Sequence, residues 1–282
     1  MNGMISQAMN EKSLMTIKTL AAFIILLAAL PAISQHTTAP EPKLVSFPAG
    51  SATLSGVYYL PQGNGPFPAV LWNHGSEPRP GTQEELAQFY TSEGFIFFLP
   101  HRRGQGRSPG PYIMYEIRRS GPDGAVRLQE TANEDVVAAM QWLRSQPQVD
   151  ANRIVVSGCS FGGIQTLLSA EKELGARAFI AFAPAAESWS NGALRLRLEE
   201  AVKSAKAPVF ILQAKNDYNI EPTKVLGKIA ASHGGRQQIY EKFGKTEQDA
   251  HWAFATTAPG IAVWRNDVLD FIHSAFQEAK DH

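Results

Sequence analysis

The sequence has few cysteines, no net charge and no long apolar segment, and each shortage excludes or disfavours a class of protein. Its 282 residues contain 1 cysteine, which excludes an intrachain disulfide and a cysteine-based zinc site. Lysine and arginine number 26, as do aspartate and glutamate, so charge gives no basis for binding nucleic acid or an anionic membrane surface. What the chain does have is 44% hydrophobic residues, enough for one sizeable core.

The N-terminal segment has the pattern of a secretory signal peptide. Lys12 and Lys18 precede an apolar run over residues 20–30, and Pro31 and small residues follow it. The run is shorter than the about 20 apolar residues that span a bilayer, so a retained membrane anchor is the less favoured alternative. We therefore predict a signal peptide over 1–34, a linker over 35–42 and a single domain over 43–282. The mature protein is expected to be periplasmic or secreted, without stable membrane association.

Short apolar runs alternate with helical periodicity through the predicted domain. Strands are expected over 68–72, 95–99, 154–156, 178–183, 209–213 and 236–243, after a hairpin over 43–60. Helices are expected over 82–93, 130–145, 161–174, 222–232 and 261–278, the first with a capping box of Thr82 and Glu85. This alternation predicts an α/β three-layer sandwich: a mostly parallel sheet of about eight strands with helices on both faces. Catalytic groups in such sheets lie at the carboxyl ends of the strands.

The sequence Gly158-Cys159-Ser160-Phe161-Gly162 stands between an expected strand and an expected helix. A Gly-x-Ser-x-Gly turn in that setting is typical of a nucleophile elbow, in which a sharp turn lifts the serine hydroxyl clear of the sheet. The alternative is a glycine-rich turn without chemistry. The flanking strand and helix favour Ser160 as a nucleophile. Cys159, one residue earlier, is expected to point into the sheet and to pack as a small apolar residue.

A serine nucleophile needs a base and an acid that orients the base, and in this type of sheet the chain order is serine, acid, histidine. Asp217 follows the strand over 209–213, and His251 lies between the last strand and the closing helix. Both positions are at strand carboxyl ends, so we predict a triad of Ser160, Asp217 and His251. Alternatives for the acid are Asp249 and Glu221, and those for the base are His233, His273 and His282.

The oxyanion of the tetrahedral intermediate needs two backbone donors. One is expected from Phe161, the residue after the nucleophile, and the other from the loop after the strand over 68–72. Ser76 is the favoured second donor and Gly75 the alternative. His74 precedes the nucleophile in the chain, so we expect it to shape this loop or to contact substrate rather than to act as the base.

Several segments carry a family resemblance: Asn73-His74-Gly75, the Arg-Gly-x-Gly-x-Ser stretch at 103–108, the elbow, Lys215-Asn216-Asp217 and the His-Trp-Ala-Phe stretch at 251–254. With these motifs, residues 68–273 resemble the dienelactone hydrolase-like family of the α/β-hydrolases, and also the catalytic domains of prolyl oligopeptidase-type peptidases. The resemblance implies an ester hydrolase without a cofactor or metal. The family's eponymous enzyme has cysteine at the nucleophile position, so Ser160 favours a general carboxylesterase over a dienelactone hydrolase.

The substrate is less well specified. The segment 108–127 is longer than a simple loop needs, and long loops at an active-site edge often shape the pocket. Side chains that could contact substrate are His74, Tyr112, Tyr115, Arg118, Trp189 and Trp252. The segment 185–206 is only a short insertion, so we expect small or soluble ester substrates. A peptidase and a non-catalytic binding protein on the same scaffold remain alternatives, and the sequence does not specify the oligomeric state.

Overall fold

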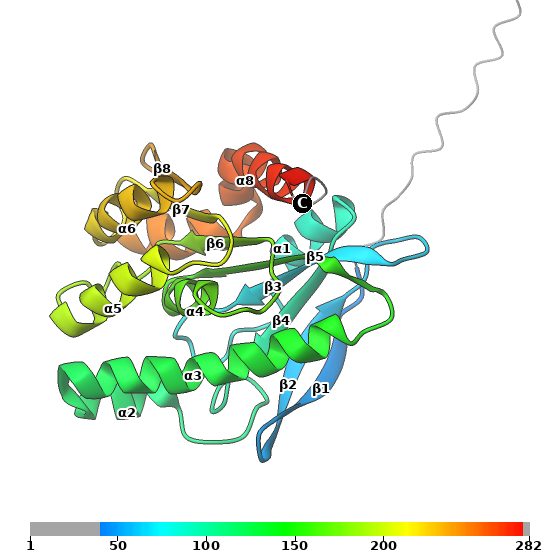
Figure 1. Cartoon of the computed structure of the whole chain (residues 1–282), viewed down its shortest axis with the longest axis horizontal. Coiled ribbons are helices and arrows are strands. Elements are labelled where there is room, and N and C mark those ends of the chain that lie inside the picture. Colours follow the sequence, from blue (N-terminus) through cyan, green and yellow to red (C-terminus); the bar gives the residue numbers. More distant parts are fainter. Residues whose placement is uncertain (1–39, 279–282) are drawn as a thin grey trace, which may run out of the picture. The chain divides into compact units, whose positions relative to one another are not determined.

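In the computed structural model, which describes residues 40–278, eight strands form one sheet with helices on both faces (Figure 1). The strand order is β1-β2-β4-β3-β5-β6-β7-β8. β1 pairs antiparallel with β2 and β2 antiparallel with β4, whereas all other neighbours pair in parallel. The strands are β1 (Lys43–Ala49), β2 (Ala52–Tyr59), β3 (Phe67–Asn73), β4 (Ile96–His101), β5 (Val149–Cys159), β6 (Ala178–Phe182), β7 (Val209–Ala214) and β8 (Arg236–Tyr240).

The helices cover the two faces of this sheet in two groups. One group packs on a core that contains Val136, Ile164 and Leu226, and the other on a core that contains Leu86 and Trp264. The first group is α3 (Gly121–Arg144), α4 (Phe161–Ala170), α5 (Gly192–Lys203) and α6 (Glu221–Ala231), and the second is α1 (Glu84–Ser92) and α8 (Ala258–Glu278). The remaining helices are α2 (Ile113–Arg119), the π-helix η1 (Asp249–Ala253) and α7 (Phe254–Thr256). The predicted three-layer architecture and strand number are confirmed.

Both faces of the central strands are buried, which explains why their sequences read as continuous apolar runs rather than as alternating ones. Every residue of β4, β6 and β7 is buried. The antiparallel edge differs, because β1 alternates between exposed and buried positions along its second half. The sheet therefore fixes the carboxyl ends of β3, β5, β6 and β7 next to one another, where the loops with the predicted site residues begin.

Two local predictions were wrong. The capping box at α1 does not form: Gln83 is the N-cap residue, with a φ of 54°, and no side chain caps the helix. Glu85 accepts instead from the backbone N–H of Ala258 at the start of α8. The segment 108–127, predicted as a loop, holds α2 and the first turns of α3. The expected short insertion over 185–206, for which no secondary structure was predicted, contains α5.

The predicted signal peptide over 1–34 and most of the predicted linker lie outside the described residues. Within residues 40–278, none of the helices is both long enough and apolar enough to cross a membrane. Residues 40–278 form one compact unit. Export of the mature domain stays a prediction.

Candidate active site

The turn between β5 and α4 holds Ser160 in a strained backbone conformation. Its φ of 60° and ψ of −119° lie in a region that residues other than glycine seldom adopt, and such strain is concentrated at functional sites. The N–H of Ser160 donates to the carbonyl of Phe182 over 3.0 Å, and its own carbonyl accepts from the N–H of Ile164 over 3.0 Å. These two bonds tie the turn to β6 and to the first turn of α4.

The two glycines that flank the turn allow a close approach to the end of β3. A Cβ on Gly162 would lie 1.9 Å from the carbonyl oxygen of Asn73 and 2.5 Å from that of His74. A Cβ on Gly158 would lie 2.6 Å from the same Asn73 oxygen. Real Cβ atoms do not tolerate such contacts with backbone, so only glycine fits. The close packing places the turn directly against the loop that begins at His74.

Asp217 and His251 meet in a buried pair. The Nδ1 of His251 lies 2.9 Å from Oδ1 and 3.0 Å from Oδ2 of Asp217, and the two side chains are 5% and 0% exposed. Asp217 also accepts from the N–H of Tyr218 over 2.6 Å, which fixes the carboxylate. A carboxylate on Nδ1 leaves Nε2 as the nitrogen that can accept a proton. Among the described residues, Nε2 has no hydrogen-bond partner.

Cys159 connects this pair to the turn. Its thiol donates to the backbone carbonyl of His251 over 3.5 Å, so the His251 backbone lies beside the residue that precedes Ser160. Burial, helped by the nearby carboxylates of Asp217, Glu77 and Glu187, raises the pKa of Cys159 well above its usual value. The thiol therefore stays protonated and packed in the core, as predicted from its place before the nucleophile.

The loop after β3 is held by side chains from the segment that follows β4. The carbonyl of Gly75 accepts from Nη2 of Arg102 over 2.5 Å, and the carbonyl of Ser76 accepts from the hydroxyl of Tyr112. The guanidinium of Arg102 also lies over the ring of Phe161, with Cζ 4.9 Å from the ring centroid. Arg102 thus contacts residues from both sides of the predicted oxyanion hole, and both carbonyl groups of this loop are engaged.

His74 shapes the loop. Its Nδ1 lies 2.9 Å from Nη2 of Arg102 and 3.0 Å from the carbonyl oxygen of Gly75. Burial, followed by the charge of Arg102, lowers the pKa of His74 well below its usual value, so the ring is neutral at neutral pH. A neutral imidazole that is fully buried beside Arg102 is a structural part of this loop.

The remaining predicted residues are placed as follows. Trp252 lies against the loop, because a Cβ on Gly75 would be 3.4 Å from its ring. Tyr115 stacks edge-on against Tyr112 with ring centroids 5.2 Å apart, whereas Arg118 is exposed on α2 and Trp189 is buried in the core. The alternatives for the acid make other contacts: Asp249 accepts from the N–H groups of Lys245 and Thr246, and Glu221 pairs with Lys224. Of the alternatives for the base, His233 follows α6, His273 is exposed on α8, and His282 lies outside the described residues.

Sequence reasoning missed two carboxylates at this site. Glu77 directly follows Ser76, and its Oε2 would be 2.6 Å from a Cβ on Gly75. Burial raises the pKa of Glu77. Glu187, in the loop after β6, has Oε2 4.0 Å from Nε2 of His251. The sequence could have indicated these two glutamates only by their place in the chain, because both follow strands whose carboxyl ends meet at this edge of the sheet.

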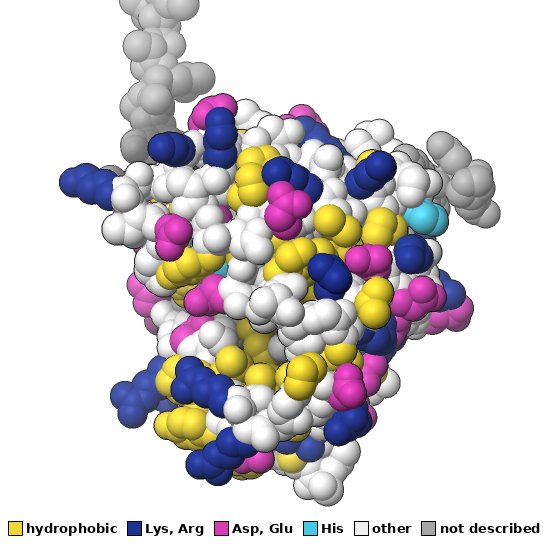
Figure 2. Space-filling view, turned by 90° about the vertical axis from the view of Figure 1, so that its left-hand side faces the viewer, with side chains coloured by type: hydrophobic (Ala, Val, Ile, Leu, Met, Phe, Trp, Pro, Cys, Tyr) yellow, Lys and Arg dark blue, Asp and Glu magenta, His cyan; other side chains and the backbone are white. Residues whose placement is uncertain are grey.

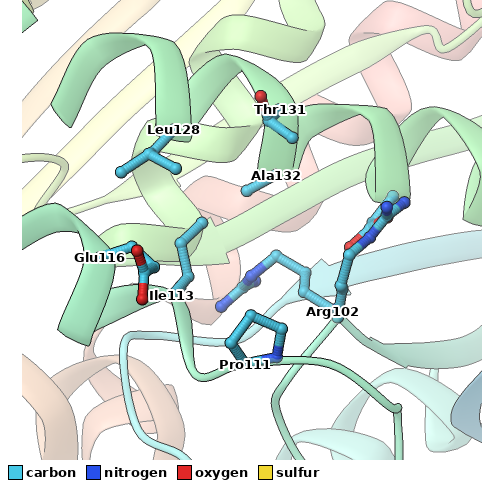
Figure 3. A pocket seen from close by; sticks show the side chains of 9 residues that line it. Arg102, Pro111, Ile113, Glu116, Leu128, Thr131 and Ala132 are labelled. Carbon is cyan, nitrogen blue, oxygen red and sulfur yellow. The ribbon is translucent and has the colours of Figure 1, made fainter. Parts of the chain in front are cut away.

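A cavity of about 140 Å³ lies next to Arg102, between α2, α3 and the loop that joins β4 to α2 (Figure 3). Ile113 from α2 and Leu128 and Ala132 from α3 give it apolar walls. Figure 2, which looks onto the side of the molecule that is on the left in Figure 1, shows a hollow with hydrophobic side chains at its base. Within the described part of the chain, no group of three or more His, Cys, Asp or Glu side chains is placed to hold a metal ion.

The comparison with protein families decides the family. The sequence model of one protein family, X-Pro dipeptidyl-peptidase (S15 family), matches residues 50–223, which is more than half of the 282 residues. The chain belongs to the S15 family. The segment matched by the S15 family model contains Ser160 and Asp217, and His251 follows it. No curated protein matches the chain by sequence.

Solved structures with the same fold include peptidases and other hydrolases. Pyrococcus horikoshii acylaminoacyl peptidase is 18% identical with a TM-score of 0.62, covering 81% of this chain and 40% of that one. The dipeptidyl peptidase 4 of Porphyromonas gingivalis is 16% identical (TM-score 0.59), covering 81% and 36%. The α/β-hydrolase GrgF from Penicillium sp. sh18 is 16% identical (TM-score 0.62), covering 84% and 99%. The chain thus spans about two fifths of the acylaminoacyl peptidase. This S15-family chain has the α/β-hydrolase fold.

Proposed function

We propose that this protein hydrolyses acyl bonds through an acyl-enzyme on Ser160. The observation that carries the proposal is the buried pair of Asp217 and His251 beside the strained turn at Ser160. In this scheme His251 takes the proton of the Ser160 hydroxyl and returns it to the leaving group, while Asp217 holds the imidazole in the required tautomer. The backbone N–H of Phe161, together with that of Ser76 or Gly75, binds the oxyanion.

Carboxylic esters of small or soluble molecules are the first substrate class. A serine nucleophile with a positioned histidine is suited to esters, and the resemblance to the dienelactone hydrolase-like family points to the same bond type. The apolar cavity beside Arg102 is close in volume to the about 150 Å³ apolar cavity that accepts benzene in another protein, so an apolar group of that size would fit.

Amide bonds of short peptides are the second class. The match to the X-Pro dipeptidyl-peptidase (S15 family) supports this class, as do the peptidases among the structures that share the fold. The same triad chemistry serves both bond types, so the choice between them depends on how well the site holds and protonates a poorer leaving group.

Labelling with a fluorophosphonate probe tests the nucleophile. We expect one adduct, located on Ser160 by mass spectrometry, and none in Ser160→Ala. Cys159→Ala is the matched control, because it removes the neighbouring thiol but leaves the serine, and its labelling should equal that of the parent. An adduct on another residue, or a folded protein that is never labelled, would contradict the proposal and favour a binding protein on a hydrolase scaffold.

A pair of chromogenic substrates then separates the two classes. p-Nitrophenyl acetate reports ester cleavage, and an aminoacyl-proline p-nitroanilide reports amide cleavage, both followed as kcat/KM on the same preparation. Cleavage of the ester alone assigns the protein to the esterases. Amide cleavage at a comparable kcat/KM would assign it to the peptidases instead. Ser160→Ala should abolish whichever activity is found, which excludes a contaminating hydrolase.

A further inference from the structure

Glu187 carries a charge at a position where no role has yet been assigned. It lies in the loop between β6 and α5, and its side chain is 59% exposed. Two residues just before it, Ala183 and Ala185, have φ values of 46° and 57°. Left-handed backbone at residues with a Cβ is unfavourable and persists only where the surroundings impose it. This strained loop brings the Glu187 carboxylate to the catalytic edge of the sheet.

The position of Glu187 relative to His251 identifies the part of a substrate that it would meet. Its Oε2 is 4.0 Å from Nε2, the nitrogen opposite the one that contacts Asp217. In a serine hydrolase this nitrogen delivers the proton to the departing alcohol or amine. A carboxylate 4.0 Å from Nε2 therefore lies beside the leaving group rather than beside the acyl group.

The charges around this point leave Glu187 uncompensated. Among residues 40–278, its one ion-pair partner within 4.0 Å is His251, which already pairs with the buried Asp217. A third carboxylate, that of Glu77, lies against Gly75 on the oxyanion side. The combined effect of these carboxylates extends to Cys159, whose pKa they help to raise. On the Nε2 side of His251, the charge of Glu187 therefore makes the space for a leaving group electronegative.

We propose that Glu187 selects substrates whose leaving group carries a positive charge, such as an ammonium group two or three bonds from the scissile oxygen or nitrogen. The inference rests on the proposed acyl-enzyme chemistry of Ser160 and adds a leaving-group preference to it. Because Glu187 is largely exposed, water screens the attraction, and Coulomb's law in a water-like medium at about 4 Å gives roughly a fivefold preference in kcat/KM.

Two esters of the same shape test this preference. Acetylcholine and 3,3-dimethylbutyl acetate differ by a quaternary nitrogen in place of a quaternary carbon, and each is hydrolysed to acetate and its alcohol. At low ionic strength we expect the cationic ester to be favoured about fivefold in kcat/KM by the parent enzyme. Glu187→Gln should bring the ratio to about 1. Glu173→Gln, a neutralised exposed glutamate after α4, should keep the parent ratio. Added salt should lower the preference of the parent.

A second measurement covers the case in which both esters are turned over too slowly. Two phosphonothiolates, with trimethylammonioethylthiol or 3,3-dimethylbutylthiol as leaving group, phosphonylate the serine as the P–S bond breaks and the thiolate leaves. We expect the cationic probe to label Ser160 about fivefold faster in the parent and equally fast in Glu187→Gln.

Three outcomes would count against the inference. They differ in whether they also refute the proposed acyl-enzyme chemistry of Ser160. Equal rates for the two probes in the parent, or an unchanged ratio in folded Glu187→Gln, would overturn the role of Glu187 and leave the acyl-enzyme intact. Absence of any adduct on Ser160 would overturn the proposed function, and the leaving-group preference with it.

Discussion

At the residue scale, the conformation of Ser160 depends on neighbours that have no side chain. The turn fits against the carbonyl groups of Asn73 and His74 only because residues 158 and 162 are glycines. This packing also places Gly162, the residue after Phe161, against the carbonyl of His74, where the loop that carries Gly75 and Ser76 begins. The glycines of the Gly-x-Ser-x-Gly pattern therefore determine the stability of the turn and, in the proposed mechanism, its catalytic geometry.

Replacement of one of these glycines should be costly. In Gly162→Ala the new methyl group would lie 1.9 Å from the carbonyl oxygen of Asn73, and backbone cannot move aside as a flexible side chain can. We expect a loss of about 3 kcal/mol in the free energy of unfolding, measured by urea denaturation, with loss of Ser160 labelling. Gly192→Ala is the control, because no atom lies within 4 Å of its Cβ position, and it should stay within about 1 kcal/mol of the parent.

The Asp217–His251 pair leads to a second prediction at this scale. Asp217→Asn keeps the size of the side chain but removes the charge, and its amide favours the wrong tautomer of His251. We expect kcat to fall by roughly 10³–10⁴-fold with KM little changed. Asp249→Asn, a substitution two residues from His251 at the start of η1, should retain most activity. The reverse result would make Asp249 the acid.

At the element scale, the segment between β4 and α3 supports the oxyanion loop from outside. Arg102 bonds to the carbonyl of Gly75, and Tyr112, the N-cap residue of α2, bonds to that of Ser76. The carbonyl of Gly75 and the N–H of Ser76 belong to one planar trans peptide group and point in opposite directions, so the bond from Arg102 to this carbonyl helps to aim the N–H of Ser76. The bond from Tyr112 fixes the next peptide group of the same loop. Through Tyr112, the start of the short helix α2 thus helps to order the loop that carries the proposed oxyanion donors.

Removal of one of these supports should affect catalysis more than folding. Tyr112→Phe loses a neutral hydrogen bond to Ser76, which is expected to cost about 1 kcal/mol or less of stability. We expect kcat/KM to fall about fivefold through kcat, because the loop is less well ordered in the transition state. Tyr115→Phe, next to it on the same helix and exposed, should leave kcat/KM unchanged. Equal losses in the two variants would indicate a general effect on α2.

The elements also show why some predictions from sequence succeeded and others failed. β4, β6 and β7 were predicted within about two residues at each end, because strands buried on both faces give uninterrupted apolar runs. α2 has no buried residue, so it left no periodic signal in the sequence. The capping box failed because Glu85 serves the start of α8, far along the chain. Asp217 and His251 could be singled out by chain order, whereas Glu187 is an ordinary exposed glutamate until the fold places it beside Nε2.

At the scale of the whole molecule, burial of neutral histidines links folding to pH. Burial lowers the pKa of His101 from 6.5 to about 4, and it lowers the pKa of His74 well below its usual value. His101 packs under the loop after β4, where its Nδ1 accepts from the N–H of Arg107 over 3.3 Å. Protonation of either ring would place a second cation close to the buried guanidinium of Arg102, whose charge already contributes to the lowered pKa of both.

Acidification should therefore weaken the fold before it protonates most carboxylates. The unfolded chain takes up a proton on His101 near pH 6.5, whereas the folded chain does so only near pH 4, so stability is full above pH 6.5 and is lost as the pH falls toward 4. This single group should lower the free energy of unfolding by about 2 kcal/mol between pH 7 and pH 5, as measured by urea denaturation.

His101→Gln should be less stable at pH 7 but should show a smaller loss of stability between pH 7 and pH 5, since it has no ring to protonate. His233→Gln, at an exposed position after α6, is the matched control and should follow the parent. If His101→Gln lost as much stability as the parent between the two pH values, the acid sensitivity would have to come from other groups.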